Sequence, residues 1–205
     1  MFTLDNAKAW MQEYSRIVGE NKEYLTELDS PIGDADHGTN MARGMAAAVE
    51  PEALDQPDLG ALFKKVGMTL VSKVGGTSGP LYGTFFMRAG KEAGASTEIE
   101  DAAFGAVLRA GLQGVIERGK AELEDKTMVD ALTPALDAFD AAVGGGLAGA
   151  AAAAAEAAEK GADATVDMLA KKGRASYLGE RSIGHRDPGA TSSQYLLQAL
   201  AAVIK

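Results

Sequence analysis

The sequence contains no cysteine among its 205 residues. Disulfide bridges, thiolate metal sites and a cysteine nucleophile are therefore excluded. Aromatic residues make up only 6% of the chain, no basic patch with interleaved aromatic residues occurs, and the formal net charge is −9. Because nucleic acids and anionic membranes attract basic proteins, we expect no nucleic acid and no membrane among the partners.

Long hydrophobic runs and a leader segment are absent as well. The longest small-apolar run lies around Ala150 to Ala155 and is far too short to cross a bilayer. The N-terminus, Met1-Phe-Thr-Leu-Asp, has no basic region followed by an apolar stretch, so we expect no signal peptide. These features predict a soluble cytoplasmic protein, and the length suits a single domain over residues 1–205.

The spacing of apolar residues is helical almost throughout the chain. Apolar residues from Ala7 to Leu25 mark one face of a first helix, with Thr3 as its N-cap. Thr127 and Asp130 resemble a capping box at the start of the sixth helix. No alternating strand pattern of useful length occurs, so we expect an all-α fold. The seven further helices are predicted over about 40–49, 59–74, 82–93, 101–118, 127–143, 148–172 and 190–204.

Eight helices with mostly short connections predict an up-and-down antiparallel bundle, in which alternate connections emerge at the same end. The connections at one end then carry almost all of the clustered charged and polar side chains, near residues 29–40, 74–83, 118–127 and 173–189. The other end receives connections made of ordinary turn residues. This segregation predicts one functional face at a single end of the bundle.

The first polar connection reads Asp29-Ser-Pro-Ile-Gly-Asp34-Ala-Asp36-His37-Gly38-Thr39-Asn40. Proline and glycine break any helix here, so three carboxylates lie on one bent loop. Such crowded carboxylates repel one another unless a cation neutralises them, and all-oxygen donors suit Mg²⁺ or Ca²⁺ rather than Zn²⁺. We interpret Asp29, Asp34 and Asp36 as a Mg²⁺–phosphate site; the alternative is an acidic helix-capping loop. The imidazole of His37, beside Asp36, is expected to have a raised pKa.

Two other polar connections resemble ligand-binding loops. Thr77 and Ser78 follow two glycines ahead of a helix, where small residues let backbone N–H groups approach an anion; the alternative is a flexible turn. The long loop that begins near Gly173 carries Arg174, which suits phosphate pairing or stacking on a base. Its last residues lead into the final helix, where Asp187 either N-caps that helix, with Pro188 at its first position, or lines a ligand. P-loop, protein-kinase and Rossmann motifs are all missing.

Together, four motifs in this order resemble the L (nucleotide-binding) subunit of dihydroxyacetone kinase. They are the aspartate loop followed by His-Gly-Thr-Asn-Met, then Gly-Gly-Thr-Ser-Gly-Pro-Leu-Tyr-Gly, Asp125-Lys-Thr-Met-Val-Asp130, and Gly-Arg-Ala-Ser-Tyr-Leu-Gly-Glu-Arg-Ser with Gly-His-Arg-Asp-Pro-Gly. The resemblance covers essentially the whole chain. It implies an all-α, closed up-and-down antiparallel barrel of eight helices.

The resemblance also assigns residues to roles. The three aspartates would hold two Mg²⁺ ions, which carry the diphosphate of the nucleotide. The family often has alanine in place of Thr77, a change that keeps the backbone donors. The implied phosphate-side contacts are His37, Gly38, Thr39, Asn40, Thr77 and Ser78, and the implied nucleoside contacts are Gly119, Met128, Arg174, Asp187, Pro188 and Gly189.

A stand-alone chain of this length is similar to the L subunits of phosphoenolpyruvate-dependent systems. The resemblance implies that Mg²⁺-bound ADP is a retained coenzyme, which a phosphocarrier (M) subunit phosphorylates in place. The phosphoryl group then passes to dihydroxyacetone on the K subunit. One alternative is an L-type subunit of an ATP-dependent kinase, with exchangeable ATP and another small keto-sugar or polyol as acceptor. A second alternative is a non-enzymatic, metal-stabilised helical binding protein. A homodimer is left open.

Overall fold

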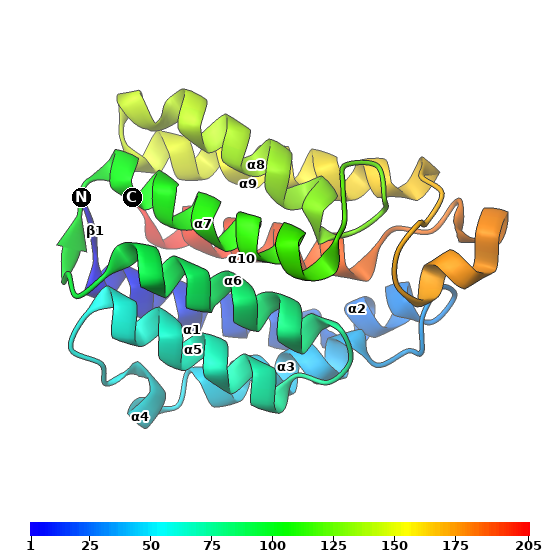
Figure 1. Ribbon diagram of the computed structural model, residues 1–205, viewed down its shortest axis with the longest axis horizontal. Coiled ribbons are helices and arrows are strands. Elements are labelled where there is room, and N and C mark those ends of the chain that lie inside the picture. Colours follow the sequence, from blue (N-terminus) through cyan, green and yellow to red (C-terminus); the bar gives the residue numbers. More distant parts are fainter.

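Eight long helices form a closed ring in the computed structural model, which describes residues 1–205 (Figure 1). Each helix packs against the next one in the chain, and the last packs against the first. The all-α, closed up-and-down arrangement predicted from the sequence is thereby confirmed. The helices of the ring are α1 (Leu4–Glu20), α3 (His37–Ala48), α5 (Leu59–Lys73), α6 (Ser78–Ala93), α7 (Asp101–Gly119), α8 (Met128–Ala142), α9 (Leu147–Ala164) and α10 (Pro188–Val203).

Short elements lie between the long helices. They are α2 (Lys22–Asp29), α4 (Pro51–Leu54), the 3₁₀ segments η1 (Val143–Gly145), η2 (Thr165–Asp167) and η3 (Arg174–Ser182), and the strands β1 (Phe2–Thr3) and β2 (Glu98–Ile99). The two strands pair antiparallel, with Phe2 opposite Ile99, and tie the N-terminus to the connection between α6 and α7. Two-residue strands leave no alternating pattern, which is why the sequence did not predict them.

Local capping explains where several helices begin. The hydroxyl of Thr3 accepts a hydrogen bond from the backbone N–H of Asn6 at 3.2 Å, as its predicted N-cap role requires. At α8, the Thr127 hydroxyl accepts from the backbone N–H of Val129 at 3.1 Å, and the Asp130 carboxylate accepts from the backbone N–H of Thr127 at 2.7 Å. The predicted capping box is therefore confirmed.

Four helix boundaries differ from those predicted by more than about two residues, the usual uncertainty of a helix end. The first predicted helix breaks at Asn21, whose side-chain amide donates to the carbonyl of Ile17 at 2.9 Å, so α2 is a separate helix. The second begins at His37 instead of residue 40. The fourth begins at Ser78 instead of residue 82, which leaves Pro80 in the first turn, where its missing N–H costs nothing. The seventh ends at Ala164 instead of residue 172.

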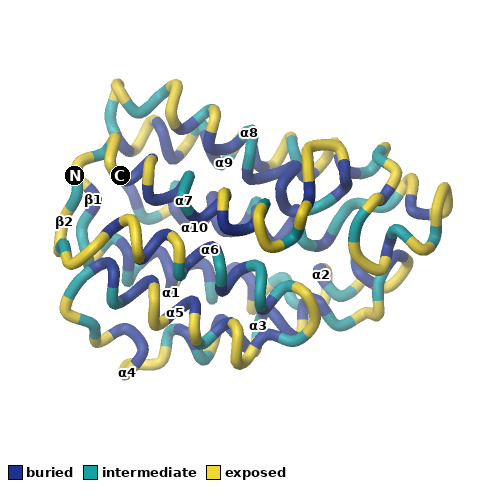
Figure 2. Tube along the Cα trace, viewed as in Figure 1, coloured by how far each residue is buried: buried dark blue, intermediate teal, exposed yellow.

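The core is one continuous cluster of 46 buried residues inside the ring. Figure 2 shows the buried stretches on the inward faces of the helices and the exposed ones on the outside. Trp10 lies in this core and donates its indole N–H to the carbonyl of Leu196 at 2.8 Å, which links α1 to α10 where the ring closes. None of the helices combines the length and hydropathy of a membrane span.

Candidate functional site

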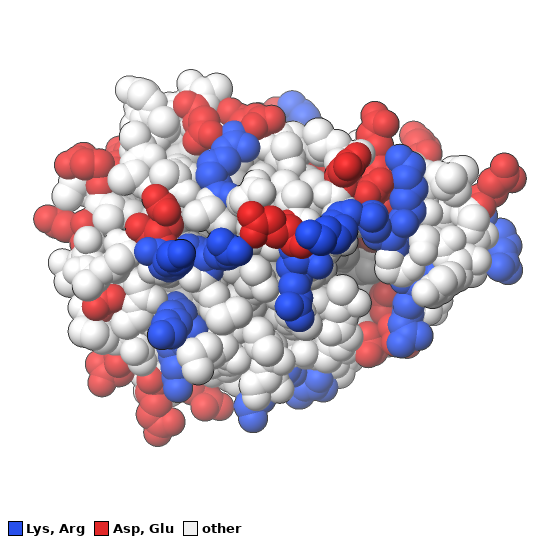
Figure 3. Space-filling view, in the orientation of Figure 1, with Lys and Arg blue, Asp and Glu red and all other residues white.

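A cavity of about 340 Å³ opens at the end of the ring opposite the two termini. Its lining comes from all four of the polar connections, namely α2–α3, α5–α6, α7–α8 and α9–α10. The up-and-down topology therefore brings these connections to one end, as predicted. Although the chain is acidic, Lys and Arg side chains gather around the hollow on the face seen in Figure 3.

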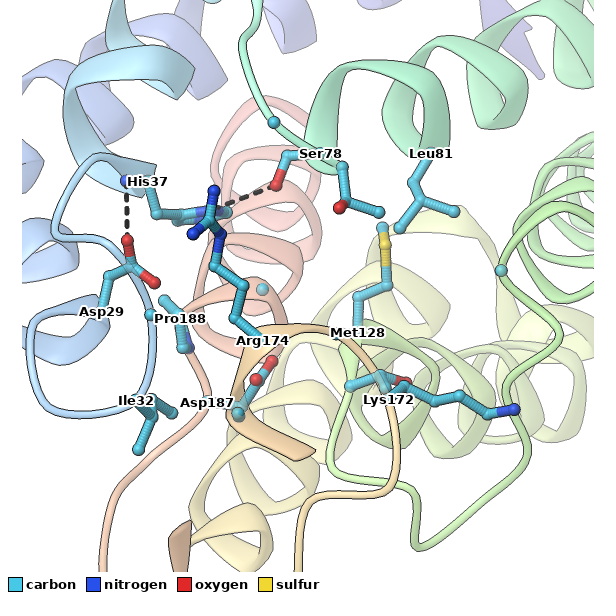
Figure 4. Close-up of a pocket in the computed structure, with 18 of the residues that line it drawn as sticks. Asp29, Ile32, His37, Ser78, Leu81, Met128, Lys172, Arg174, Asp187 and Pro188 are labelled. Carbon is cyan, nitrogen blue, oxygen red and sulfur yellow. Dashed lines mark hydrogen bonds between the residues drawn. The ribbon is translucent and has the colours of Figure 1, made fainter. Parts of the chain in front are cut away.

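Asp29 occupies the floor of the cavity with a fixed carboxylate. It is the last residue of α2 and is 7% exposed. Its Oδ2 atom accepts hydrogen bonds from the backbone N–H groups of Asp36, at 2.9 Å, and His37, at 3.2 Å, at the start of α3 (Figure 4). Gly33 makes room for this carboxylate, because a Cβ atom at position 33 would overlap it. The orientation of Asp29 is therefore set by the loop itself.

Asp34 and Asp36 complete a cluster with Asp29. One carboxylate oxygen from each residue lies within 4.8 Å of the others. Ala35, between the two outer aspartates, has a φ of 58°, in the left-handed region that is strained for a residue with a side chain. Three convergent carboxylates fit a hard divalent cation such as Mg²⁺, which binds through one or two protein carboxylates and phosphate oxygens. Their role as metal ligands stays a prediction.

His37 is buried, with both ring nitrogens engaged. Its Nδ1 lies 3.1 Å from the hydroxyl of Ser78 on α6, and its Nε2 lies 2.9 Å from the hydroxyl of Ser192 on α10. Burial lowers the pKa of His37 to about 4, and the Asp29 and Asp36 carboxylates only partly oppose this shift. The expectation of a raised pKa was therefore wrong, because the Asp29 carboxylate binds backbone N–H groups and the imidazole is buried among hydroxyls.

Of the fifteen residues proposed from the sequence, the structure places thirteen on the cavity wall. Gly38 and Thr39 do not line it. Both lie in the first turn of α3, between the inward-facing His37 and Asn40; Thr39 is exposed, and a Cβ atom at position 38 would overlap the Lys22 carbonyl of α2. The thirteen are Asp29, Asp34, Asp36, His37, Asn40, Thr77, Ser78, Gly119, Met128, Arg174, Asp187, Pro188 and Gly189.

Sequence reasoning proposed Met128 but missed the rest of the apolar part of the wall, including Leu81. The side chains of Leu81 and Met128 point toward one another on one side of the cavity (Figure 4), and a Cβ atom at position 119 would come within 3.3 Å of Leu81. Leu81 follows Ser78 by three positions, so helical spacing could have placed it on the same face. The other missed side chains include Ile32, Val115, Ala121, Lys126 and Lys172. The cavity thus joins a carboxylate cluster to an apolar wall, an arrangement that suits an amphipathic ligand.

Asp187 both caps a helix and lines the cavity. Its carboxylate accepts a hydrogen bond from the backbone N–H of Ala190 at 2.7 Å, with Pro188 as the first residue of α10. The N-cap reading offered for the sequence is therefore confirmed. Burial raises the pKa of Asp187 to about 7, against the opposing effects of that hydrogen bond and of the nearby Lys126 ammonium.

Comparison with known proteins identifies relatives of the chain. The DAK2 domain family matches residues 31–202. The chain is 45% identical over 207 residues to the ADP-binding subunit DhaL of the PTS-dependent dihydroxyacetone kinase of Lactococcus lactis, with 100% of both chains covered. It is 47% identical over 199 residues to the ADP-binding subunit DhaL of the PEP-dependent dihydroxyacetone kinase of Escherichia coli, covering 96% of this chain and 95% of that one.

A solved structure shares the fold. The dihydroxyacetone kinase of C. freundii, in complex with AMP-PNP and Mg²⁺, aligns with a TM-score of 0.76 at 27% identity over 95% of this chain. This chain spans 33% of that longer one. Fold and site thus define a kinase subunit, in the phosphotransferase class. More closely, the chain belongs to the DhaL family of PEP-dependent dihydroxyacetone kinase subunits within the DAK2 domain family.

Proposed function

We propose that this chain is the nucleotide-binding phosphotransfer subunit of a dihydroxyacetone kinase, with Mg²⁺-bound ADP as its coenzyme. An M subunit phosphorylates ADP in place, and the phosphoryl group passes to dihydroxyacetone on a K subunit, giving dihydroxyacetone phosphate. The observation that carries the proposal is the carboxylate cluster around the fixed Asp29, inside a cavity lined by all four polar connections. The names of the DhaL relatives support ADP as the ligand.

Each part of the cavity has a task in this proposal. Asp29, Asp34 and Asp36 hold the metal, which when bound neutralises phosphate charge and orients the phosphate oxygens. Ser78 and Arg174 face the same space and can donate hydrogen bonds to phosphate oxygens. The apolar wall suits the base of the nucleotide. Because both ring nitrogens of His37 are engaged, we assign deprotonation of the acceptor hydroxyl to the K subunit.

A second candidate function uses exchangeable ATP. The C. freundii kinase binds AMP-PNP, an ATP analogue, on a similar fold. In this alternative the chain serves an ATP-dependent kinase, with another small keto-sugar or polyol as acceptor. The two candidates differ in how long the nucleotide stays bound, so the rate of nucleotide exchange distinguishes them.

The content of the purified protein tests the proposal directly. The protein is dialysed in Mg²⁺ buffer and denatured, the released nucleotide is identified by chromatography, and Mg²⁺ is counted by elemental analysis. A retained coenzyme predicts near-stoichiometric ADP with about two Mg²⁺ per chain, as in a two-metal site. An empty site that exchanges ATP freely favours the second candidate. A protein that binds neither ADP nor ATP overturns both.

A matched pair of variants ties the result to the carboxylate cluster. Asp36→Asn removes one charge from the cluster, and Asp55→Asn removes one exposed charge at the opposite end of the ring. We expect Asp36→Asn to lose Mg²⁺ and ADP, and to lose phosphoryl transfer with the K and M partners. Asp55→Asn should keep all three. Full activity in Asp36→Asn would contradict the assignment of the metal site.

A further inference from the structure

A continuous line of side-chain hydrogen bonds runs from the core to the cavity wall. The hydroxyl of Tyr82 on α6 lies 2.7 Å from the hydroxyl of Ser192, which lies 2.9 Å from His37 Nε2. On the other side of the imidazole, His37 Nδ1 lies 3.1 Å from the hydroxyl of Ser78. Tyr82 and Ser192 are at most 1% exposed; Tyr82 borders the cavity, and Ser78, which is less buried, lines it as well. The line therefore joins buried groups to a ligand-facing hydroxyl.

Both ring nitrogens of His37 contact hydroxyl oxygens and neither contacts a carboxylate, which suits a neutral imidazole. A neutral imidazole carries one N–H and one bare nitrogen, so the direction of this line depends on the tautomer. If Nε2 carries the hydrogen, His37 donates to Ser192 and accepts from Ser78. The Ser78 hydrogen then points away from the cavity, and only oxygen lone pairs face an anion. If Nδ1 carries the hydrogen, His37 donates to Ser78 and accepts from Ser192. The Ser78 hydrogen is then free to point into the cavity.

The surroundings of Ser192 favour the second direction. The Tyr82 hydroxyl lies 2.7 Å from the hydroxyl of Ser192 and 3.0 Å from that of Ser193, so it can donate to the nearer Ser192 oxygen and accept from Ser193. The Ser192 hydrogen then has two acceptors in reach, His37 Nε2 at 2.9 Å and the Gly189 carbonyl at 3.1 Å. His37 is the nearer, and a hydroxyl that already accepts a hydrogen bond is a stronger donor. The carbonyl of Gly189 also lies in the first turn of α10, where the helix supplies backbone donors of its own.

We propose that Tyr82 and Ser192 hold His37 in the Nδ1–H tautomer and thereby turn the hydroxyl hydrogen of Ser78 toward an anionic group in the cavity. Tyr82, Ser192 and His37 are positioning residues, and Ser78 is the residue that contacts the ligand. The identity of that anion as a nucleotide phosphate rests on the proposed function. The tautomer does not depend on it, because the hydrogen bonds exist in the protein itself.

Nitrogen-15 NMR of the free protein near neutral pH tests the tautomer. Protonated and bare ring nitrogens differ widely in chemical shift, and their couplings to the carbon-bound ring protons distinguish Nδ1 from Nε2. The chain has only two histidines, so a His185→Gln variant assigns the remaining signals to His37. We expect Nδ1–H in the unsubstituted protein. An Nε2–H tautomer would overturn the proposal.

One substitution and one control test the cause. Tyr82→Phe removes the donor to Ser192, whose oxygen can then accept from Nε2–H while its own hydrogen goes to the Gly189 carbonyl, so this variant should shift His37 toward the Nε2–H tautomer. Thr84→Val removes another hydroxyl of α6, one that donates to the Pro80 carbonyl at 2.7 Å, and it should leave the tautomer unchanged. Nδ1–H that persists in Tyr82→Phe would refute the positioning role.

Titration with ADP and Mg²⁺ separates this inference from the proposed function. Tyr82→Phe should bind ADP roughly three- to tenfold more weakly, as expected for one lost hydrogen bond, while Thr84→Val binds as the unsubstituted protein does. Unchanged ADP affinity in a variant whose tautomer has shifted would refute the link to Ser78. A protein with the expected tautomer that binds no ADP would refute the proposed function and leave the hydrogen-bond line established.

Discussion

Arg174 forms an ion pair with Asp34, with Nη2 and Oδ2 separated by 2.8 Å. The two residues lie on different polar connections, since Arg174 begins η3 and Asp34 lies just before α3. The guanidinium thus extends across the cavity (Figure 4) and shares a carboxylate with the proposed metal site. We therefore expect a divalent cation bound at this cluster to compete with Arg174 for Asp34 and to free Arg174 for phosphate oxygens.

Removing this guanidinium should affect metal and nucleotide in opposite directions. In Arg174→Ala without nucleotide, we expect Mg²⁺ to bind more tightly by no more than about fivefold, the effect of one exposed ion pair. ADP should bind more weakly, because a phosphate partner is lost. Calorimetric titrations measure both. Arg181→Ala removes an exposed arginine from the same segment and serves as the control. Weaker Mg²⁺ binding in Arg174→Ala would contradict the competition.

Adding a methyl group at Gly33 should disable the carboxylate cluster without unfolding the protein. The new Cβ would overlap the Asp29 carboxylate and force it away from the N–H groups of Asp36 and His37. We expect Gly33→Ala to bind Mg²⁺ and ADP about 10- to 100-fold more weakly, the usual result of disturbing the support of a metal ligand. Circular dichroism should be unchanged. Gly19→Ala, which meets no neighbouring atom in α1, is the control and should retain binding.

The carboxyl of Asp187 on the cavity wall should make the stability of the metal-free protein depend on pH. Its pKa is about 7 when folded, above the usual value of 3.8. A raised pKa means that the stabilising contribution is fully present below pH 4 and is lost as pH rises through 7. Asn keeps an N-cap acceptor but cannot ionise. From pH 5 to pH 7, Asp187→Asn should therefore gain about 1–3 kcal/mol of unfolding free energy relative to the unsubstituted protein.

Urea unfolding in EDTA at several pH values measures this difference. The Asp58→Asn variant is the matched control, because Asp58 also N-caps a long helix, accepting from Ala61 N–H at 2.7 Å, but lies at the opposite end of the ring, away from the cavity. The relative stability of Asp58→Asn should not rise in the same way. If Asp187→Asn and the unsubstituted protein followed parallel pH curves, the protonated carboxyl would be ruled out.

Most of the fold follows from local patterns in the sequence. Helical spacing predicts the eight helices, capping residues such as Thr3 and Thr127 mark their starts, and the order of connections predicts which loops share one end. These signals act within a few residues, so they can be recognised in the sequence without knowledge of the tertiary structure. The carboxylate loop is visible for the same reason, because its three aspartates are close in sequence.

Contacts between segments that are far apart in the sequence cannot be predicted from such local patterns. His37 and Ser192 are 155 positions apart, so nothing local shows that the imidazole turns toward α10 and loses its proton. Burial then lowers the pKa of His37 by more than the neighbouring carboxylates raise it. The end of α9 is a similar case. Thr165 donates its hydroxyl to the Ala162 carbonyl, and Lys126 from another connection binds the Thr165 carbonyl, although the apolar spacing continues beyond Ala164.

Lys126 should therefore be a structural support for the cavity. It is 1% exposed, and its ammonium donates to the backbone carbonyls of Thr165, at 2.6 Å, and Met168, at 3.2 Å. These bonds fasten the α7–α8 connection to the α9–α10 connection, and both connections line the cavity. Lys126→Met keeps the length of the side chain but leaves buried carbonyls without this donor. We expect a loss of about 1–3 kcal/mol in unfolding free energy.

The same variant should loosen one segment more than the rest of the protein. Hydrogen exchange of the backbone amides in residues 165–187 should speed up in Lys126→Met, while exchange in α1 and α5 changes only with global stability. Lys120→Met removes an exposed lysine from the same connection and should alter neither stability nor exchange. ADP affinity should fall in Lys126→Met, because Arg174 and Asp187 lie in the loosened segment. Uniformly faster exchange in every helix would instead mean that Lys126 supports the whole fold and not the cavity wall.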